Sequence, residues 1–232
     1  YPPGNRVTLL QCGAEFFPAL EAAIDAALSE VRLETYILAD DETGRRIAAA
    51  MKRAVLRGVA VRVVHDGVGS AGFLGNLGET MRQDGVEVAV FRPETWWNTF
   101  RRSRLRRLHR KLAMIDGRVA FVGGINLIDD LNMPEPRQPR FDYAVRVEGP
   151  LLEPIHAAMC ELWARLHQHG IERLRAVMTA FPANTQAAGD HHAWFAFRDN
   201  VSRRRDIERE YLAAILAAKQ DILIANAYFF PG

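Results

Sequence analysis

The hydrophobic positions of the first 91 residues alternate between the spacing typical of helices and the short apolar runs typical of buried strands. In order, the pattern predicts a helix over 15–28, a strand over 31–38, a helix over 43–57, a strand over 59–64, a short helix before Gly85 and a strand over 86–91. Strands that alternate with helices favour a parallel sheet covered on both faces. We therefore expect an α/β fold with a mixed, largely parallel sheet and helices on both faces.

The second half of the chain begins with an interruption of this regularity over 92–108. Two strands are then predicted on either side of Asp116 and Gly117, because Asp-Gly is a strong signal for a tight hairpin. A further strand is predicted over 141–149 and a long helix over 151–169, whereas 170–200 is rich in small and polar residues and is interpreted as a linker.

A possible internal repeat lies at the end of the chain, where residues 211–230 resemble residues 19–38 without gaps. Leu20 corresponds to Leu212 and Tyr36 to Tyr228. One explanation is that Ala-rich helices leading into strands resemble one another, and the other is a duplication whose second copy begins here. On the second interpretation, residues 1–170 form the first repeat, 171–205 a connecting segment and 206–232 the truncated start of a second repeat. Because the chain begins at Tyr1 rather than Met, we expect it to be part of a longer protein.

The composition is that of an ordinary soluble globular protein, with 232 residues, 49% hydrophobic and 25% charged. A formal net charge of +2 is too small to indicate a nucleic-acid or membrane partner by itself. Cys12 and Cys160 have no metal-ligand spacing and do not suggest a disulfide framework, which favours a reducing compartment. No signal peptide and no apolar run of about 18 residues is seen, and no cofactor or metal is expected.

The most informative stretch for chemistry is "LHRKLAMIDGRVAFVGGIN", residues 108–126. On a strand, residues two apart share a face, so His109 and Lys111 are expected to project together. A neutral imidazole can attack phosphorus and form a phosphohistidine, while Lys111 and the Asn126 amide would stabilise charge on the phosphate oxygens. Gly123 and Gly124 would let the backbone approach the substrate. Each of these residues alone is more often structural, but their joint spacing is rare.

This spacing, HxKxxxxD followed by GGxN, resembles the signature of the phospholipase D superfamily. The residues that carry it are His109, Lys111, Asp116, Gly123, Gly124 and Asn126. Segments such as "LETYILADDETGR", "RFDYAVRVEGP" and "LIANAYFFPG" extend the resemblance to bacterial cardiolipin synthases of the B type. The resemblance implies two such motifs related by a pseudo-twofold axis, with one histidine attacking, the other protonating the leaving group, and no metal. Only one motif is present here, so a second repeat or a homodimer partner would complete the site.

Two carboxylates, Asp116 and Asp142, are candidates for a role beside the histidine. Asp116 stands at a hairpin turn, where a carboxylate often only fixes the loop. Asp142 is the better candidate for orienting the imidazole, because the family often uses an acidic residue on the following strand. We expect His109, Lys111, Asn126 and Asp142 to converge on one accessible pocket at an end of the sheet, with Asp142 within hydrogen-bond reach of the imidazole.

A basic and aromatic segment lies immediately before the motif. Arginines beside tryptophans suit an anionic membrane surface, although a solvated basic face or a nucleic-acid contact has the same composition. The residues expected to bind the membrane are Trp96, Trp97, Arg101, Arg102, Arg104, Arg106 and Arg107.

The function expected from the resemblance is phosphatidyl transfer, in which phosphatidylglycerol is converted to cardiolipin through a phosphohistidine. The alternatives are a nuclease or other phosphodiesterase of the same superfamily, and a non-catalytic lipid-binding module. The expected partners are anionic phospholipid and a membrane surface, with nucleic acid less favoured. The resemblance also implies a peripheral location on the cytoplasmic face of the bacterial inner membrane.

Overall fold

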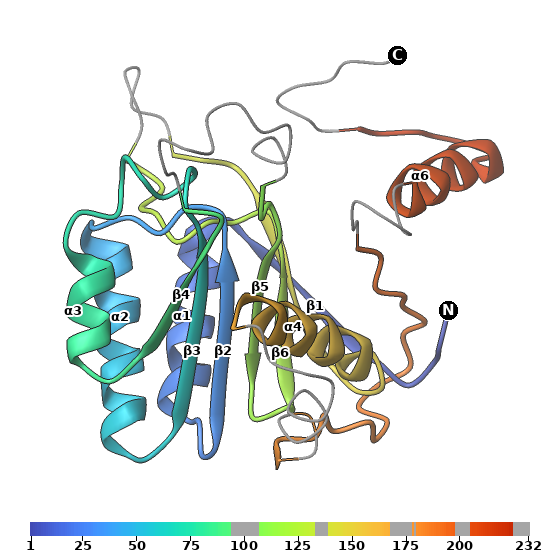
Figure 1. The fold of residues 1–232 in the computed structure, drawn as a ribbon. Helices are drawn as coiled ribbons and strands as arrows, with labels where there is room; N and C mark the ends of the chain where they lie inside the picture. The colour runs from blue at the N-terminus through green and yellow to red at the C-terminus, as the bar shows by residue number, and fades with distance from the viewer. Residues whose placement is uncertain (94–106, 133–138, 168–177, 179, 198–204, 225–232) are drawn as a thin grey trace. The chain divides into compact units, whose positions relative to one another are not determined.

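The computed structural model describes residues 1–93, 107–132, 139–167, 178, 180–197 and 205–224 (Figure 1). The chain divides into two compact units, Tyr1–Trp194 and Phe195–Gly232, each of which is described by itself. Among the described residues, no helix combines the length and the apolar character needed to cross a membrane.

The first unit is built around a seven-stranded sheet in the order β1-β7-β6-β5-β2-β3-β4. Its strands are β1 (Arg6–Gln11), β2 (Glu30–Thr35), β3 (Ala60–Asp66), β4 (Glu87–Phe91), β5 (Lys111–Ile115), β6 (Val119–Gly123) and β7 (Tyr143–Glu148). Strands β2, β3 and β4 pair in parallel, whereas the other four pairings are antiparallel. The predicted mixed α/β sheet is confirmed. The prediction that most of its strands pair in parallel is wrong, because helical crossovers connect only β2, β3 and β4.

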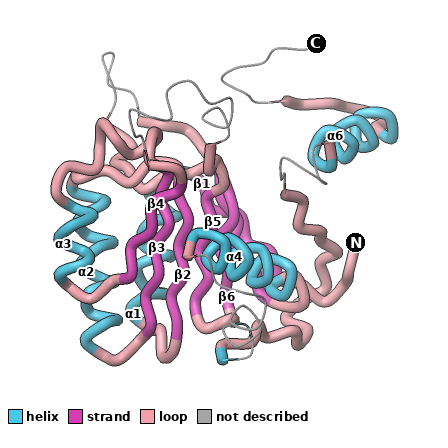
Figure 2. Tube along the Cα trace, viewed as in Figure 1, coloured by secondary structure: helices cyan, strands magenta, loops and turns pink. Residues whose placement is uncertain are grey.

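Helices cover both faces of this sheet, as predicted (Figures 1 and 2). One face carries α1 (Cys12–Asp25), α2 (Glu42–Leu56) and α3 (Leu77–Gln83), and the other face carries α4 (Leu152–Leu166). The core on the first face is formed where Phe16, Leu20 and Ile24 of α1, spaced four residues apart, pack against apolar strand residues such as Leu33 and Phe121.

The face of β2 that points toward α4 carries buried charges rather than apolar side chains. Glu30, Arg32 and Glu34 are each no more than 2% exposed. Glu30 lies 2.7 Å from Arg32 and 3.8 Å from His156 of α4. Because a buried charge is tolerated only when it is paired, this second layer is held by ion pairs as well as by apolar contact.

The predicted hairpin is confirmed. Asp116 and Gly117 both have positive φ, at 52° and 60°, and Arg118 N donates to Ile115 O at 2.9 Å. Asp and Gly tolerate this backbone conformation better than other residues, which is why the dipeptide marks the turn.

One edge of the sheet collects the residues of interest. The carboxyl ends of β2, β3, β4 and β6 and the amino ends of β5 and β7 meet there, at the top of Figure 1. In open α/β sheets, ligands bind outside the carboxyl ends of the strands. A ligand is therefore expected at this edge of the sheet.

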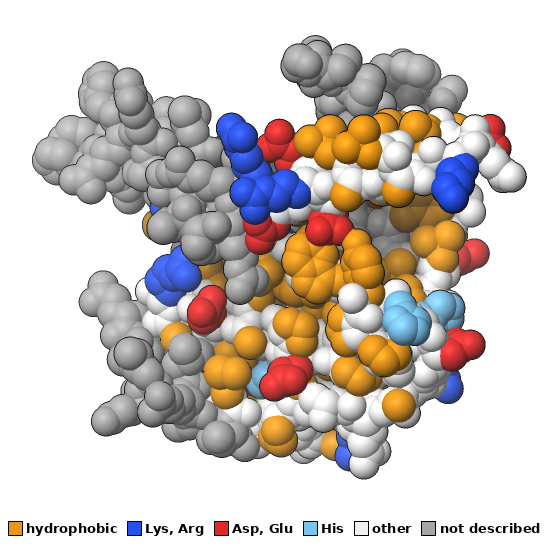
Figure 3. All heavy atoms as spheres, turned by 90° about the vertical axis from the view of Figure 1, so that its right-hand side faces the viewer, with side chains coloured by type: hydrophobic (Ala, Val, Ile, Leu, Met, Phe, Trp, Pro, Cys, Tyr) orange, Lys and Arg blue, Asp and Glu red, His pale blue; other side chains and the backbone are white. Residues whose placement is uncertain are grey.

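The second unit contains α6 (Asp206–Ala217), none of whose residues is buried. Hydrophobic side chains along this helix are open to view in Figure 3. The exposed hydrophobic residues of α6 include Tyr211, Leu212 and Leu216. In the possible repeat, residue 19 corresponds to residue 211. The last residue of α1, Asp25, then corresponds to Ala217, where α6 also ends.

Part of the expected connecting segment packs on the first unit. Asn184 N donates to Gly117 O at 2.7 Å, and Ala188 N donates to Gly4 O at 2.8 Å. The boundaries of the expected repeats remain a prediction.

Candidate active site

His109 lies just before β5 with its side chain exposed, and Lys111 is the first residue of that strand. Lys111 is only 8% exposed, and its Nζ donates to His109 O at 2.9 Å and lies 3.4 Å from His109 Nδ1. The structure therefore brings an accessible imidazole and a largely buried ammonium together, as the spacing predicts.

The electrostatics of this pair favour a neutral imidazole. Partial burial and the positive charge of Lys111 lower the pKa of His109, and the Asp66 carboxylate opposes them. Burial lowers the pKa of Lys111 to about 8, and the Asp142 carboxylate opposes this shift. Near pH 7 an uncharged ring nitrogen consequently stands beside an ammonium that is still mostly charged.

Asn126 joins this group through the chain that follows β2. Its Oδ1 accepts a hydrogen bond from Ile37 N at 3.0 Å, which fixes the amide and leaves its two N–H donors for other acceptors. Ile37 follows Tyr36, whose ring centroid lies 5.0 Å from that of His109 and 5.5 Å from Lys111 Nζ. The segment at residues 36–37 thus connects Asn126 to the histidine and lysine.

The two glycines have a packing role. A Cβ at Gly123 would come within 2.5 Å of Ala144 Cα, and a Cβ at Gly124 would collide with the Asp142 carboxylate. Both glycines are therefore required for close packing of β6 against the start of β7. Their expected role in letting the backbone approach a substrate remains a prediction.

The hydrogen bond expected between Asp142 and the imidazole does not form, so this prediction is wrong. Asp142 Oδ1 instead accepts from Tyr143 N at 2.7 Å, and the carboxylate acts electrostatically on Lys111. The reason is topological, because β6 lies between β7 and β5 and separates their backbones by about 10 Å.

Asp116 lies at the opposite end of β5, about 16 Å of strand from Lys111. Its carboxylate accepts hydrogen bonds from Leu28 N, Ser29 N, Ser29 Oγ and Glu30 N, all at 2.8–2.9 Å. The structure does not bring this motif residue to the histidine and places it instead as the anchor of the turn between α1 and β2.

Two residues that the sequence analysis did not propose lie at the site. The ring of Tyr36 lies beside the imidazole of His109, tilted by 47°. The fully buried Asp66, the last residue of β3, acts on the imidazole charge. The signal for Tyr36 was its match in the repeat, whereas Asp66 could only have been suspected from its position at a strand end.

Most of the expected membrane-binding residues, namely Trp96, Trp97, Arg101, Arg102, Arg104 and Arg106, lie outside the described residues. Arg107 is described and is partly buried. Its Nη1 lies 3.4 Å from Asp66 Oδ1 and 3.5 Å from Arg92 O, so this arginine takes part in internal contacts.

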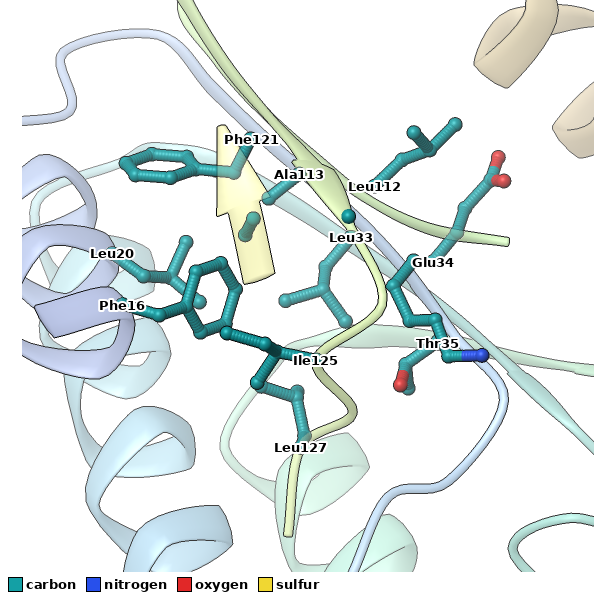
Figure 4. A pocket seen from close by; sticks show the side chains of 13 residues that line it. Phe16, Leu20, Leu33, Glu34, Thr35, Leu112, Ala113, Phe121, Ile125 and Leu127 are labelled. Carbon is teal, nitrogen blue, oxygen red and sulfur yellow. The ribbon is translucent and has the colours of Figure 1, made fainter. Parts of the chain in front are cut away.

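A small cavity is lined by Phe16 and Leu20 of α1 (Figure 4) and in part by Lys111. It has a volume of about 10 Å³ and a largely apolar lining that includes Leu33, Phe121 and Ile125. It has room for about one water molecule and is too small for a phosphate group. A substrate would therefore have to meet His109 at the open edge of the sheet. Across the described ranges, no group of three or more His, Cys, Asp or Glu could hold a metal ion.

Comparison with known proteins agrees with this geometry. The family model described as "Cardiolipin synthase, PLD-like domain" matches residues 20–135. The chain is 37% identical to cardiolipin synthase B of Salmonella typhi and 33% identical to cardiolipin synthase B of Escherichia coli strain K12. Each match covers 99% of this chain and 55% of the relative, so the chain spans about half the length of these relatives.

Among solved structures, NucT from Helicobacter pylori is similar in fold, with a TM-score of 0.50 and 17% identity over 71% of this chain and 96% of that one. Three observations support the same family assignment. They are the exposed histidine beside a buried lysine at the edge of a mixed sheet, the HxK and GGxN residues, and these similarities. The chain belongs to the phospholipase D superfamily, in the family of cardiolipin synthase domains.

Proposed function

We propose that this chain supplies one of the two catalytic motifs of a phosphatidyltransferase that makes cardiolipin from phosphatidylglycerol. The observation that carries the proposal is the exposed His109 imidazole, whose pKa is lowered beside Lys111. The similarity to cardiolipin synthase B over 99% of the chain supplies the substrate class. Because the chain spans 55% of those relatives, the complete activity belongs to a longer protein or to an assembly.

The first step forms a covalent intermediate. A neutral nitrogen of His109 attacks the phosphorus of phosphatidylglycerol, a P–N bond forms, and the P–O bond to the headgroup glycerol breaks. Glycerol leaves with a proton donated by a second histidine, which comes from another motif. The phosphatidyl group remains on His109.

The second step returns the enzyme to its starting state. A hydroxyl of a second phosphatidylglycerol attacks phosphorus, loses its proton to the second histidine, and displaces His109. The new P–O bond completes cardiolipin. No net proton, electron or cofactor is consumed.

Lys111 and Asn126 have complementary roles in both steps. The ammonium and the free amide N–H groups would hold the non-bridging phosphate oxygens, on which negative charge increases in the transition state. Because burial already places Lys111 in a site of low dielectric, its charge acts on the phosphate more strongly than it would in water.

The second histidine would come from a second repeat of the same protein or from a homodimer partner. As a monomer, this chain alone is therefore expected to have little or no turnover, whereas activity confined to a homodimer would indicate a shared site. The proposed location is a bacterial membrane, with the protein bound peripherally to its cytoplasmic face. The basic segment before the motif, with its two tryptophans, suits contact with anionic headgroups.

The test uses the longer protein that contains this chain, purified and given phosphatidylglycerol vesicles without added metal. Cardiolipin and free glycerol should appear in equal amounts, and His109→Ala should abolish both. Cleavage of DNA that depends on His109, without cardiolipin, would replace this proposal by the nuclease alternative. Vesicle binding without any reaction would favour the lipid-binding module.

A further inference from the structure

A fully buried carboxylate lies at the same edge of the sheet as the histidine. Asp66 is 0% exposed, and its Oδ1 accepts hydrogen bonds from Val68 N at 2.9 Å and Gly69 N at 3.0 Å. Its Oδ2 accepts a hydrogen bond from Leu108 N at 2.8 Å. Burying a charge is costly unless it is hydrogen-bonded, so these donors explain why the carboxylate is tolerated. Arg107 is a fourth donor, with its Nη1 3.4 Å from Asp66 Oδ1. The donor to Oδ2, Leu108, is the residue directly before His109.

The backbone on both sides of His109 is anchored, whereas His109 itself is exposed. Before it, Leu108 is 5% exposed and packs in a cluster with Val64 and Trp163. After it, Arg110 forms an ion pair with the buried Glu34, and its Nη2 donates to the carbonyl of Ala158 in α4 at 3.1 Å. Asp66 therefore adds a contact that holds the backbone in front of the exposed histidine side chain.

The charges that act on the imidazole are few. Lys111 lowers the pKa of His109 and Asp66 raises it, while the aromatic ring of Tyr36 lies beside the imidazole. Asp142 acts on Lys111 rather than on the imidazole. Among the described residues, Asp66 is thus the carboxylate that influences the charge of His109.

We propose that Asp66 is the positioning residue of His109, fixing the backbone in front of it and supplying a stationary negative charge within range of the ring. The proposal rests on the proposed function, because attack by the neutral imidazole leaves positive charge on the ring. A fixed negative charge stabilises that product, and a fixed backbone keeps the nitrogen in line with phosphorus. Asp66 touches neither substrate nor reacting atom, and it acts through Leu108 and through its charge.

The test is an NMR titration of the imidazole of His109 in this chain, in the wild type and in Asp66→Asn. The variant keeps the shape of the side chain and removes its charge, so the pKa of His109 should fall below the wild-type value. Asp41→Asn is the matched control. Asp41 also accepts backbone N–H groups from two segments, Gly44 at 2.9 Å and Asp129 at 2.8 Å, but does not act on His109.

An unchanged pKa of His109 in folded Asp66→Asn would overturn the proposal and leave Asp66 as an ordinary loop anchor. If Asp66→Asn does not fold, the wild type still tests the backbone contact, because the hydrogen bond to Asp66 should strongly protect the Leu108 amide proton from exchange. Rapid exchange of that proton would contradict the proposal. These measurements need no lipid, so they succeed or fail independently of the proposed function.

The longer protein gives a second readout. Asp66→Asn should lower kcat for cardiolipin formation by roughly tenfold or more, with little change in KM, because misplacement of a catalytic group affects the transition state more than binding. A change in KM alone would count against a positioning role.

Discussion

Replacing Asp116 tests whether the acidic residue of the motif stabilises the fold. Its carboxylate accepts four hydrogen bonds at the turn between α1 and β2. A hydrogen bond to a charged group contributes about 1.5–3 kcal/mol to stability. Because water can reach this half-buried turn and replace lost hydrogen bonds, the loss of all four costs less than their sum. We expect Asp116→Ala to lower the free energy of unfolding by about 3 kcal/mol, which includes the strain of Ala at a φ of 52°.

For a protein of this size, about 3 kcal/mol corresponds to a fall in Tm of roughly 6–12 °C. Thermal unfolding followed by circular dichroism measures it. Asp25→Ala is the control, because Asp25 forms an exposed pair with Arg53 and should contribute no more than about 1 kcal/mol. If Asp116→Ala unfolds no earlier than Asp25→Ala, the anchoring role of Asp116 is refuted.

The difference in the free energy of unfolding between wild type and Asp116→Ala should depend on pH in a definite direction. Burial alone would raise the pKa of Asp116, but the hydrogen bonds from Glu30, Leu28 and Ser29 outweigh it and lower the pKa below its ordinary value of 3.8. The stabilisation is therefore present above pH 3.8 and is lost as the pH falls through the lower value in the folded state. The difference between wild type and Asp116→Ala should be complete at pH 7 and should shrink in acid.

Three further predictions concern other parts of the first unit. Contacts with Cys160 and Glu30 outweigh burial and raise the pKa of His156 to about 9, so the free energy of unfolding of the wild type should fall as the pH rises from 6.5 through 9. In urea titrations, His156→Gln should show a weaker dependence on pH over this range. Gly123→Ala should lower the free energy of unfolding by about 2 kcal/mol, because its Cβ meets the neighbouring strand, and an unchanged urea midpoint would contradict this. In the longer protein, activity should decline above about pH 8 as Lys111 loses its proton, and Lys111→Arg should move the decline to higher pH; a profile identical to wild type would contradict the role of Lys111.

The elements that sequence could predict are those whose burial pattern is strong. The helix that carries Leu20 and Ile24 and the buried strands β2 and β3 follow directly from apolar spacing. Strand β1 was missed, because only Leu10 of its six residues is buried and its pairing with β7 is set by tertiary contact. Apart from the predicted hairpin of β5 and β6, the antiparallel pairings were missed for a related reason, since apolar spacing reports burial and not strand direction.

Within the site, sequence could place residues that are close along the chain. His109 and Lys111 lie two residues apart, and their proximity follows from strand geometry alone. Asp66 lies 42 residues before Leu108, and only the pairing of β2 with β3 and β5 brings them together. The hydrogen bond between Asp142 and the imidazole was wrongly expected, because the position of the intervening strand β6 follows only from the sheet order.

The proposed reaction depends on covalent phosphatidylation of His109. The most direct test mixes the longer protein with phosphatidylglycerol labelled at phosphorus, quenches the reaction within a turnover, and locates the label by peptide mapping. We expect an acid-labile phosphatidyl group on the peptide that contains His109, absent in His109→Ala and discharged to cardiolipin when more phosphatidylglycerol is added. Cardiolipin formation with no label on His109 at any quench time would contradict it.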